Sequence, residues 1–190
     1  MFVRVLTTFV LLTVSFGASA AKFDINLNQD SARFVYSSLI GGSTFGRTEM
    51  SAGLLYNEDK NSVWELGLQV IDVAGTKTPG LEVGVGPKLY YFTSDKPDAS
   101  GGAIALGGNL HYKFTQLQRL AISGTLYYAP SITATLDADS FFEAGLRVGY
   151  EILPTASVYL GVRRIHAEYN KGKGSHTLDS GGVVGLKLAF

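Results

Sequence analysis

The sequence predicts an all-β protein, a transmembrane antiparallel up-and-down β-barrel of ten strands, with about eight strands as the alternative count. The first observation is that apolar and polar positions alternate in segment after segment, which is the period of a β-strand. The second is composition, because 23 glycines, 10 tyrosines and 11 phenylalanines are typical of a strand-rich chain. The third is the stretch 182–190, in which one face carries the apolar residues Val184, Leu186, Leu188 and Phe190. An apolar closing strand suits a barrel whose outer face meets lipid.

Residues 1–20 have the features of a cleaved secretory signal. Arg4 precedes an apolar run over 5–16, and the small residues Ala18, Ser19 and Ala20 follow. A membrane anchor is the alternative, but the run is shorter than the about 20 residues that span a bilayer as a helix. We therefore expect a single exported barrel domain over residues 21–190.

Charge and cysteine content exclude several function classes. The full chain has 16 Lys plus Arg and 16 Asp plus Glu. Removing residues 1–20 takes away Arg4, which leaves 15 basic and 16 acidic residues and a net charge of about −1. This balance argues against a nucleic-acid partner, which normally requires a basic excess. The chain has no cysteine, so disulfides and cysteine-based metal sites are impossible.

Ten segments can be followed along residues 21–190. The first two, 22–28 and 31–39, flank a turn at Gln29 and Asp30, and the first of them is short. Each of the next three segments has an apolar face. These faces are Met50, Ala52, Leu54 and Tyr56 in the third segment; Trp64, Leu66, Leu68 and Val70 in the fourth; and Leu81, Val83, Val85, Leu89 and Tyr91 in the fifth. Pro87 interrupts the fifth segment and predicts a local bulge, because proline removes a ladder hydrogen bond.

The later segments repeat the pattern. Their apolar faces are Ile104, Leu106, Leu110, Tyr112 and Phe114; Leu120, Ile122, Leu126 and Tyr128; Phe142, Ala144, Leu146, Val148 and Tyr150; Val158, Leu160 and Val162; and the closing stretch. Most segments approach the about 9 to 11 residues that a tilted strand needs to cross a bilayer. An even count places both chain ends in the periplasm.

Loop lengths and rim aromatics indicate the orientation. The longer breaks, at 95–101, 131–139 and 170–179, are expected outside, and the shorter ones, at 115–118 and 153–156, in the periplasm. Aromatics then form an outer girdle of Tyr56, Trp64, Tyr91, Tyr128 and Phe142 and an inner girdle of Tyr112, Phe114, Tyr150 and Phe190. A soluble periplasmic ligand-binding barrel would have the opposite polarity, with its apolar face inside.

Inward-facing charges are the main candidate functional residues. They are Glu49, Glu65, Glu82, Lys88, Lys113, Glu143, Arg147, Glu151, Arg163 and Lys187. Barrels of about eight strands are filled by their own side chains, so we expect ion pairs inside, with inward glycines making room for Tyr127 and Tyr159. A narrow diffusion channel is the alternative, because six inward glycines leave volume unassigned.

The stretches Phe23-Asp24-Ile25-Asn26-Leu27 and Leu186-Lys187-Leu188-Ala189-Phe190 carry a family resemblance. With the length and the signal, they make the chain similar to the YfaZ-like group of small bacterial outer-membrane proteins. This resemblance implies an outer-membrane location in a Gram-negative bacterium, and the ending resembles the strand recognised by the barrel-assembly machinery. It implies no catalytic activity.

No catalytic, metal or cofactor motif is expected to operate. His111, His166 and His176 fit no zinc spacing, and His166 with Glu168, or Ser175 beside His176, is weak support for a triad. The remaining candidates are basic groups above the apolar band of the ninth segment, Arg164, His166, Lys171 and Lys173. Solvated loop charge with an arginine that reaches out of the apolar band is the first reading of this patch, and binding of lipopolysaccharide phosphates is the more specific hypothesis. We therefore predict a non-enzymatic outer-membrane barrel, expected to be a monomer, with a structural or surface-interaction role.

Overall fold

A computed structural model describes residues 20–44, 46–74, 78–95, 98–169 and 174–190 of the chain. Its strands are β1 (Ala21–Leu27), β2 (Ser31–Ser43), β3 (Gly46–Asn57), β4 (Ser62–Val73), β5 (Leu81–Ser94), β6 (Ala99–Lys113), β7 (Leu120–Ala129), β8 (Ala134–Leu136), β9 (Ala138–Leu153), β10 (Ala156–Tyr169) and β11 (Gly174–Ala189). A 3₁₀ turn, η1 (Ser131–Thr133), precedes β8. Within the described ranges, no helix is both long and apolar enough to cross a membrane.

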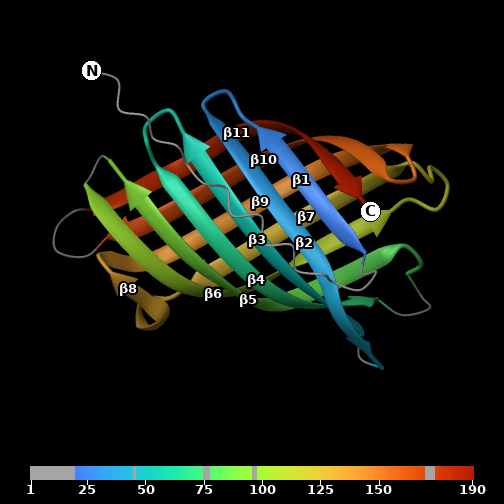
Figure 1. Ribbon diagram of the computed structural model, residues 1–190, viewed down its shortest axis with the longest axis horizontal. Helices are drawn as coiled ribbons and strands as arrows, with labels where there is room; N and C mark the ends of the chain where they lie inside the picture. The colour runs from blue at the N-terminus through green and yellow to red at the C-terminus, as the bar shows by residue number, and fades with distance from the viewer. Residues whose placement is uncertain (1–19, 45, 75–77, 96–97, 170–173) are drawn as a thin grey trace, which may run out of the picture.

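Ten of the strands form one closed antiparallel barrel (Figure 1). Neighbours in sequence pair with each other, β1 pairs with β11, and the pairing of β5 with β6 closes the ring. The short β8 lies outside this ring order and pairs only with the start of β6, from Gly101 opposite Leu136 to Ala103 opposite Ala134. The prediction of an all-β, up-and-down barrel with ten strands is confirmed, and the short first segment is a full member of the wall.

The closing seam joins the first and last strands. Their register runs from Lys22 opposite Ala189 to Leu27 opposite Val184. Beyond that register, the Phe190 N–H donates to the Ala21 carbonyl at 2.9 Å. We call the end of the barrel that holds Ala21 and Phe190 the terminal end, and the opposite end, with β8 and the β3–β4 turn, the far end (Figure 1).

The two faces of the wall differ in polarity. Large apolar side chains on the outer face are exposed in every strand; examples are Leu66, Leu106, Leu126, Leu146 and Leu160, of which Leu106 and Leu160 are each 67% exposed. Charged and hydrogen-bonding side chains point inward instead, as Glu65, Gln69 and Glu143 do. An apolar exterior around a polar interior is the pattern of a transmembrane barrel and the reverse of a soluble one.

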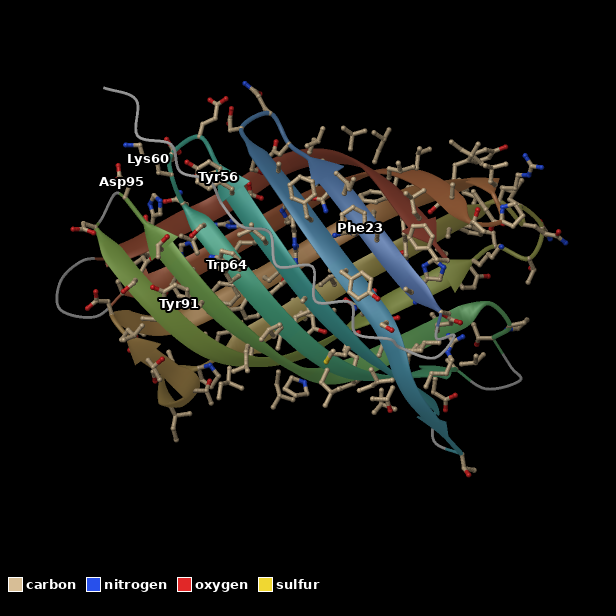
Figure 2. All side chains as sticks on the ribbon, in the orientation of Figure 1. Phe23, Tyr56, Lys60, Trp64, Tyr91 and Asp95 are labelled. Atoms are coloured by element: carbon tan, nitrogen blue, oxygen red, sulfur yellow. The ribbon has the colours of Figure 1, made fainter. Side chains whose placement is uncertain are left out.

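The outer aromatics include a cluster on three adjacent strands. Tyr56, Trp64 and Tyr91 come from β3, β4 and β5, and all three are about half exposed (Figure 2). Trp64 lies directly opposite Tyr91 in the β4–β5 register. At the terminal end, Tyr112 and Phe114 contact each other with ring centroids 5.0 Å apart. These positions agree with the two predicted girdles.

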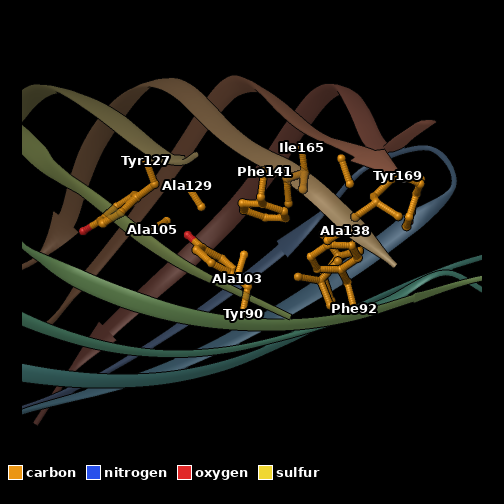
Figure 3. Packing of buried hydrophobic residues seen from close by; sticks show 14 of the residues in the cluster. Tyr90, Phe92, Ala103, Ala105, Tyr127, Ala129, Ala138, Phe141, Ile165 and Tyr169 are labelled. Atoms are coloured by element: carbon orange, nitrogen blue, oxygen red, sulfur yellow. The ribbon is translucent and has the colours of Figure 1, made fainter. Parts of the chain in front are cut away.

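An apolar cluster fills the far half of the lumen. Its aromatic members are Tyr90, Phe92, Tyr127, Phe141 and Tyr169, joined by Leu55, Val63, Ile165, Leu178 and small alanines. The Phe92 and Phe141 rings stack with centroids 5.2 Å apart, and the centroids of the Phe141 and Tyr90 rings are 4.3 Å apart (Figure 3). We call this group the far-end plug, because its side chains lie inside the wall and are almost fully buried.

The bulge predicted at Pro87 is wrong. The β4–β5 register has the same offset on both sides of the proline, with Gly67 opposite Lys88 and Val70 opposite Val85. Pairing is interrupted between those two pairs, but no extra residue is inserted. At Gly86 the strands approach so closely that a Cβ would collide with the Leu68 carbonyl. The missing proline N–H therefore leaves a gap in the ladder while the strands stay in register.

The predicted outer breaks are also too long. β6 already begins at Ala99, β9 begins at Ala138, and β11 begins at Gly174. Part of the last break, residues 170–173, lies outside the described residues. The strands extend past the apolar band because polar residues can still pair in a ladder, and hydropathy alternation cannot mark where such pairing ends.

Candidate functional site

A buried arginine links two glutamates across the lumen. Arg33 of β2 contacts Glu65 of β4 at 2.5 Å through one terminal nitrogen and Glu143 of β9 at 2.7 Å through the other. The three side chains are 5%, 3% and 2% exposed. A guanidinium between two carboxylates gives strong charge-assisted hydrogen bonds. This group, the Arg33 cluster, joins three strands that are not neighbours in the ring.

A lysine and two tyrosines complete the Arg33 cluster. Lys88 Nζ lies 3.6 Å from Glu65 and 3.8 Å from Glu143, so the two carboxylates face two cations. The Tyr90 hydroxyl donates to Glu143, and the Lys88 ammonium sits 4.4 Å from the centre of the Tyr127 ring. Charge is balanced inside the cluster, which a buried ion group requires.

A second buried arginine stabilises the region beneath the β1–β2 turn. Arg163 Nε donates to Asp179 at 2.6 Å, and its terminal nitrogens donate to Asn26 and to Ser31 Oγ. On the same side, the side-chain amide of Asn57 donates to the Leu178 carbonyl at 2.8 Å. These bonds connect β10 to β1, β2 and β11, and the end of β3 to β11.

Glycines on the inner face accommodate neighbouring side chains. A Cβ at Gly185 would collide with the Tyr159 ring, so Gly185 provides the space for that tyrosine. Space beside Gly53 is taken by the Glu65 side chain, whereas at Gly161 a Cβ would first meet the Leu146 backbone carbonyl. The expectation that inward glycines make room for inward tyrosines therefore holds for Tyr159.

The terminal half of the lumen contains a polar cavity of about 470 Å³. It extends from the Arg33 cluster to the β9–β10 turn at Pro154 and Thr155, and none of Phe92, Phe141, Tyr169 or Leu178 lines it. The cavity therefore ends where the Arg33 cluster and the far-end plug begin.

The ten predicted lumen charges all lie inside the barrel, and nine of them line this cavity. Only some pair with each other: Lys113 with Glu151 at 2.6 Å, and Lys88 with Glu65 and Glu143. The others pair with residues that the sequence reasoning missed: Glu49 with Lys22, Glu82 with Arg47, Arg147 with Asp24, and Arg163 with Asp179. For Lys187 the expectation of an ion pair is wrong, since no described carboxylate lies within the 4.0 Å of an ion pair.

Arg33 is the most important residue that was missed. The outward residues Phe34 and Tyr36 are both 43% exposed, and a period of two then places Arg33 inside. This alternation could have identified Arg33 as an inward residue. Its partners could not be inferred, because Glu65 and Glu143 come from strands on other sides of the ring.

The predicted rim residues are only partly described. Arg164 follows Val162 on the outer face of β10 and is exposed, with Ala144 and Ser180 as its register partners. His166 Nδ1 is hydrogen bonded to Thr177 Oγ1 at 3.2 Å. Lys171 and Lys173 lie outside the described residues. The predicted closing face lies on the outside, where Val184, Leu186 and Phe190 are exposed and Leu188 is half-buried.

The three histidines do not form one group, although His176 on β11 lies one register position from the residue opposite His166 on β10. His111 is hydrogen bonded to Ser123 at 2.8 Å inside the barrel, while His166 is on β10. In the described part of the chain, no group of three or more His, Asp or Glu residues could hold a metal ion.

Comparison with known proteins places the chain in a family. No curated protein matches it. The solved structures that are similar include a KdgM porin in complex with disordered oligogalacturonate, at 13% identity, and a KdgM porin, at 12% identity. Both have a TM-score of 0.46, and each similarity covers 90% of this chain and 99% of the other. The family described as YfaZ precursor matches residues 2–190, which confirms the resemblance seen in the sequence, and the chain belongs to that family.

Proposed function

We propose that this protein is an integral outer-membrane β-barrel with a structural or surface-interaction role. It has no catalytic activity, and its lumen is closed. The observation that carries this proposal is the far-end plug. Its buried side chains fill the far half of the lumen next to the Arg33 cluster, with which the plug shares Tyr90 and Tyr127. This packing supports a lumen that is closed to solutes. Barrels of this size are generally filled by their own side chains.

The polarity of the two faces supports the membrane location. An exposed apolar exterior would be costly in water but is favoured in a bilayer, and the charged interior is satisfied by internal ion pairs. The soluble ligand-binding alternative requires the opposite arrangement and is therefore disfavoured.

Planar-bilayer recording tests the closed lumen and its alternative, a narrow diffusion channel. We expect the inserted wild-type protein to give no steady conductance steps. The double variant Phe92→Ala and Phe141→Ala, which removes the stacked rings of the plug, is expected to give small steps. Heat-modifiable migration verifies that both proteins are folded. Steady wild-type conductance equal to that of the variant would favour the diffusion channel.

For the surface interaction, we propose lipopolysaccharide as the partner of the outer rim. Arg164 is exposed on the outer face directly after the apolar residues of β10, without an ion pair to a described residue. Arginine can meet phosphate with paired hydrogen bonds. The proposal also includes His166 and, from the sequence alone, Lys171 and Lys173.

Replacing Arg164, Lys171 and Lys173 together with glutamine tests this partner. The variant should melt at a lower temperature than wild type in lipopolysaccharide-containing bilayers, because its phosphate contacts are lost. In neutral detergent, the variant and wild type should have the same melting temperature. Arg119→Gln, at the terminal end, is the control for loss of charge as such. Equal destabilisation in both media would contradict the proposal.

A further inference from the structure

The terminal half of the lumen holds two more positive than negative side chains. Eight Lys or Arg residues and six Asp or Glu residues line the cavity. Each of the six carboxylates is in an ion pair with a cation of the same lining, and these pairs use six of the eight cations. Lys187 and Arg119 are left without an ion pair among the described residues.

Lys187 lies beside a carboxylate that is already occupied. Its direct cross-strand neighbour on β1 is Asp24. One Asp24 oxygen accepts from Arg147 at 3.0 Å, and the other accepts from the Tyr159 hydroxyl and from the side-chain amide of Asn26. Arg147 is fixed further by its position over the Tyr159 ring, at 4.8 Å. Both oxygens of Asp24 are therefore already bound by other groups, and Lys187 makes no ion pair with this carboxylate.

Arg119 and several hydrogen-bonding side chains lie along the same cavity. Arg119, in the β6–β7 connection, is exposed at the terminal end, where its carbonyl accepts from the Glu151 N–H at 2.8 Å. His111 lines the cavity from β6, four places from β11 in the ring of ten strands. Hydroxyl side chains of Ser123, Thr125 and Ser157 lie in the same lining. A charge excess of one sign in a cleft raises the local concentration of the opposite ion.

We propose that this cavity is a binding site for a small dianion of carboxylate or phosphate chemistry, which enters from the terminal end past Arg119 and is held by Lys187. The cavity volume lies in the range of about 300 to 1,000 Å³ that is usual for small-molecule sites. Two uncompensated cations match two negative charges, and the lining hydroxyls supply neutral donors. The far-end plug makes this a site with one entrance. The inference goes beyond the barrel's proposed role, and binding does not depend on whether the barrel conducts.

A single introduced cysteine tests the proposal, because the chain has none of its own. Thr125→Cys places a thiol in the cavity wall. In the detergent-solubilised protein, this thiol should react faster with the anionic reagent sulfonatoethyl methanethiosulfonate than with its trimethylammonium analogue, by about tenfold. Succinate or inorganic phosphate should slow the reaction at fixed ionic strength, whereas chloride should not, and the more protective anion identifies the preferred chemistry.

Matched variants decide the role of the two cations. In the Thr125→Cys background, Lys187→Gln should abolish both the anion preference and the protection, and Arg119→Gln should reduce both. Lys60→Gln, in the β3–β4 turn at the far end, should change neither. If Lys187→Gln does not fold, the test rests on Arg119→Gln, which must then reduce both the anion preference and the protection. A reaction ratio near one in the parent, or an unchanged ratio in both variants, would overturn the proposal.

Discussion

Replacing Arg33 with methionine is expected to lower the free energy of unfolding by about 3 kcal/mol or more, because it leaves two buried carboxylates with one cation. Lys88 remains at 3.6 and 3.8 Å from them, so the loss should lie near the lower end of the usual range for a broken buried pair. Methionine keeps much of the side-chain volume, so the effect reports charge and not a cavity. Urea unfolding in phospholipid vesicles measures it through the midpoint and slope.

Two further variants separate charge from packing. Arg47→Met breaks another arginine–glutamate pair, with Glu82, but its side chains are 50% and 35% exposed. Arg47→Met should lower the free energy of unfolding by less than about 1 kcal/mol. Adding Glu143→Gln to Arg33→Met should recover part of the lost stability, because one unpaired charge is removed. Similar costs for Arg33→Met and Arg47→Met would contradict the assignment of the Arg33 cluster as a structural centre.

Leu106→Arg is expected to lower the free energy of unfolding in a bilayer by about 2 to 4 kcal/mol. Leu106 is the eighth residue of the 15-residue strand β6 and is 67% exposed on the outer face. Arginine there would meet lipid near the middle of the wall. Thr125→Arg is the matched control, because it puts the same side chain into the polar cavity. A larger loss for Thr125→Arg than for Leu106→Arg would contradict the assigned polarity.

The barrel itself was predictable from the sequence, and the contacts inside it were not. Alternation around residues such as Leu66 and Glu65 identifies each strand and its two faces, because a strand has a period of two. The same pattern gives no information about which inward residues meet across the lumen. That depends on register and on the order around the ring, so Glu143 was predicted to face inward but its pairing with Arg33 was not.

Two other features had no sequence signal strong enough to identify them. The far-end plug is made of inward aromatics such as Phe92 and Phe141, which interrupt the expected polar interior above the apolar band. β8 is only three residues long and pairs with β6 within a stretch predicted to be a loop. Lys187 was expected to take part in the internal ion pairs, but the carboxylate directly opposite it, Asp24, is bound by Arg147 and Tyr159.

The most direct test that the outer face meets lipid uses the only tryptophan in the chain, Trp64, which is 54% exposed on the outside of β4. Its fluorescence can be recorded after folding into vesicles of lipids brominated at different depths. Because Trp64 belongs to the rim aromatics, we expect strong quenching, greatest when the bromines lie nearest the headgroups. No quenching at any depth, together with free access of aqueous iodide, would contradict a transmembrane barrel.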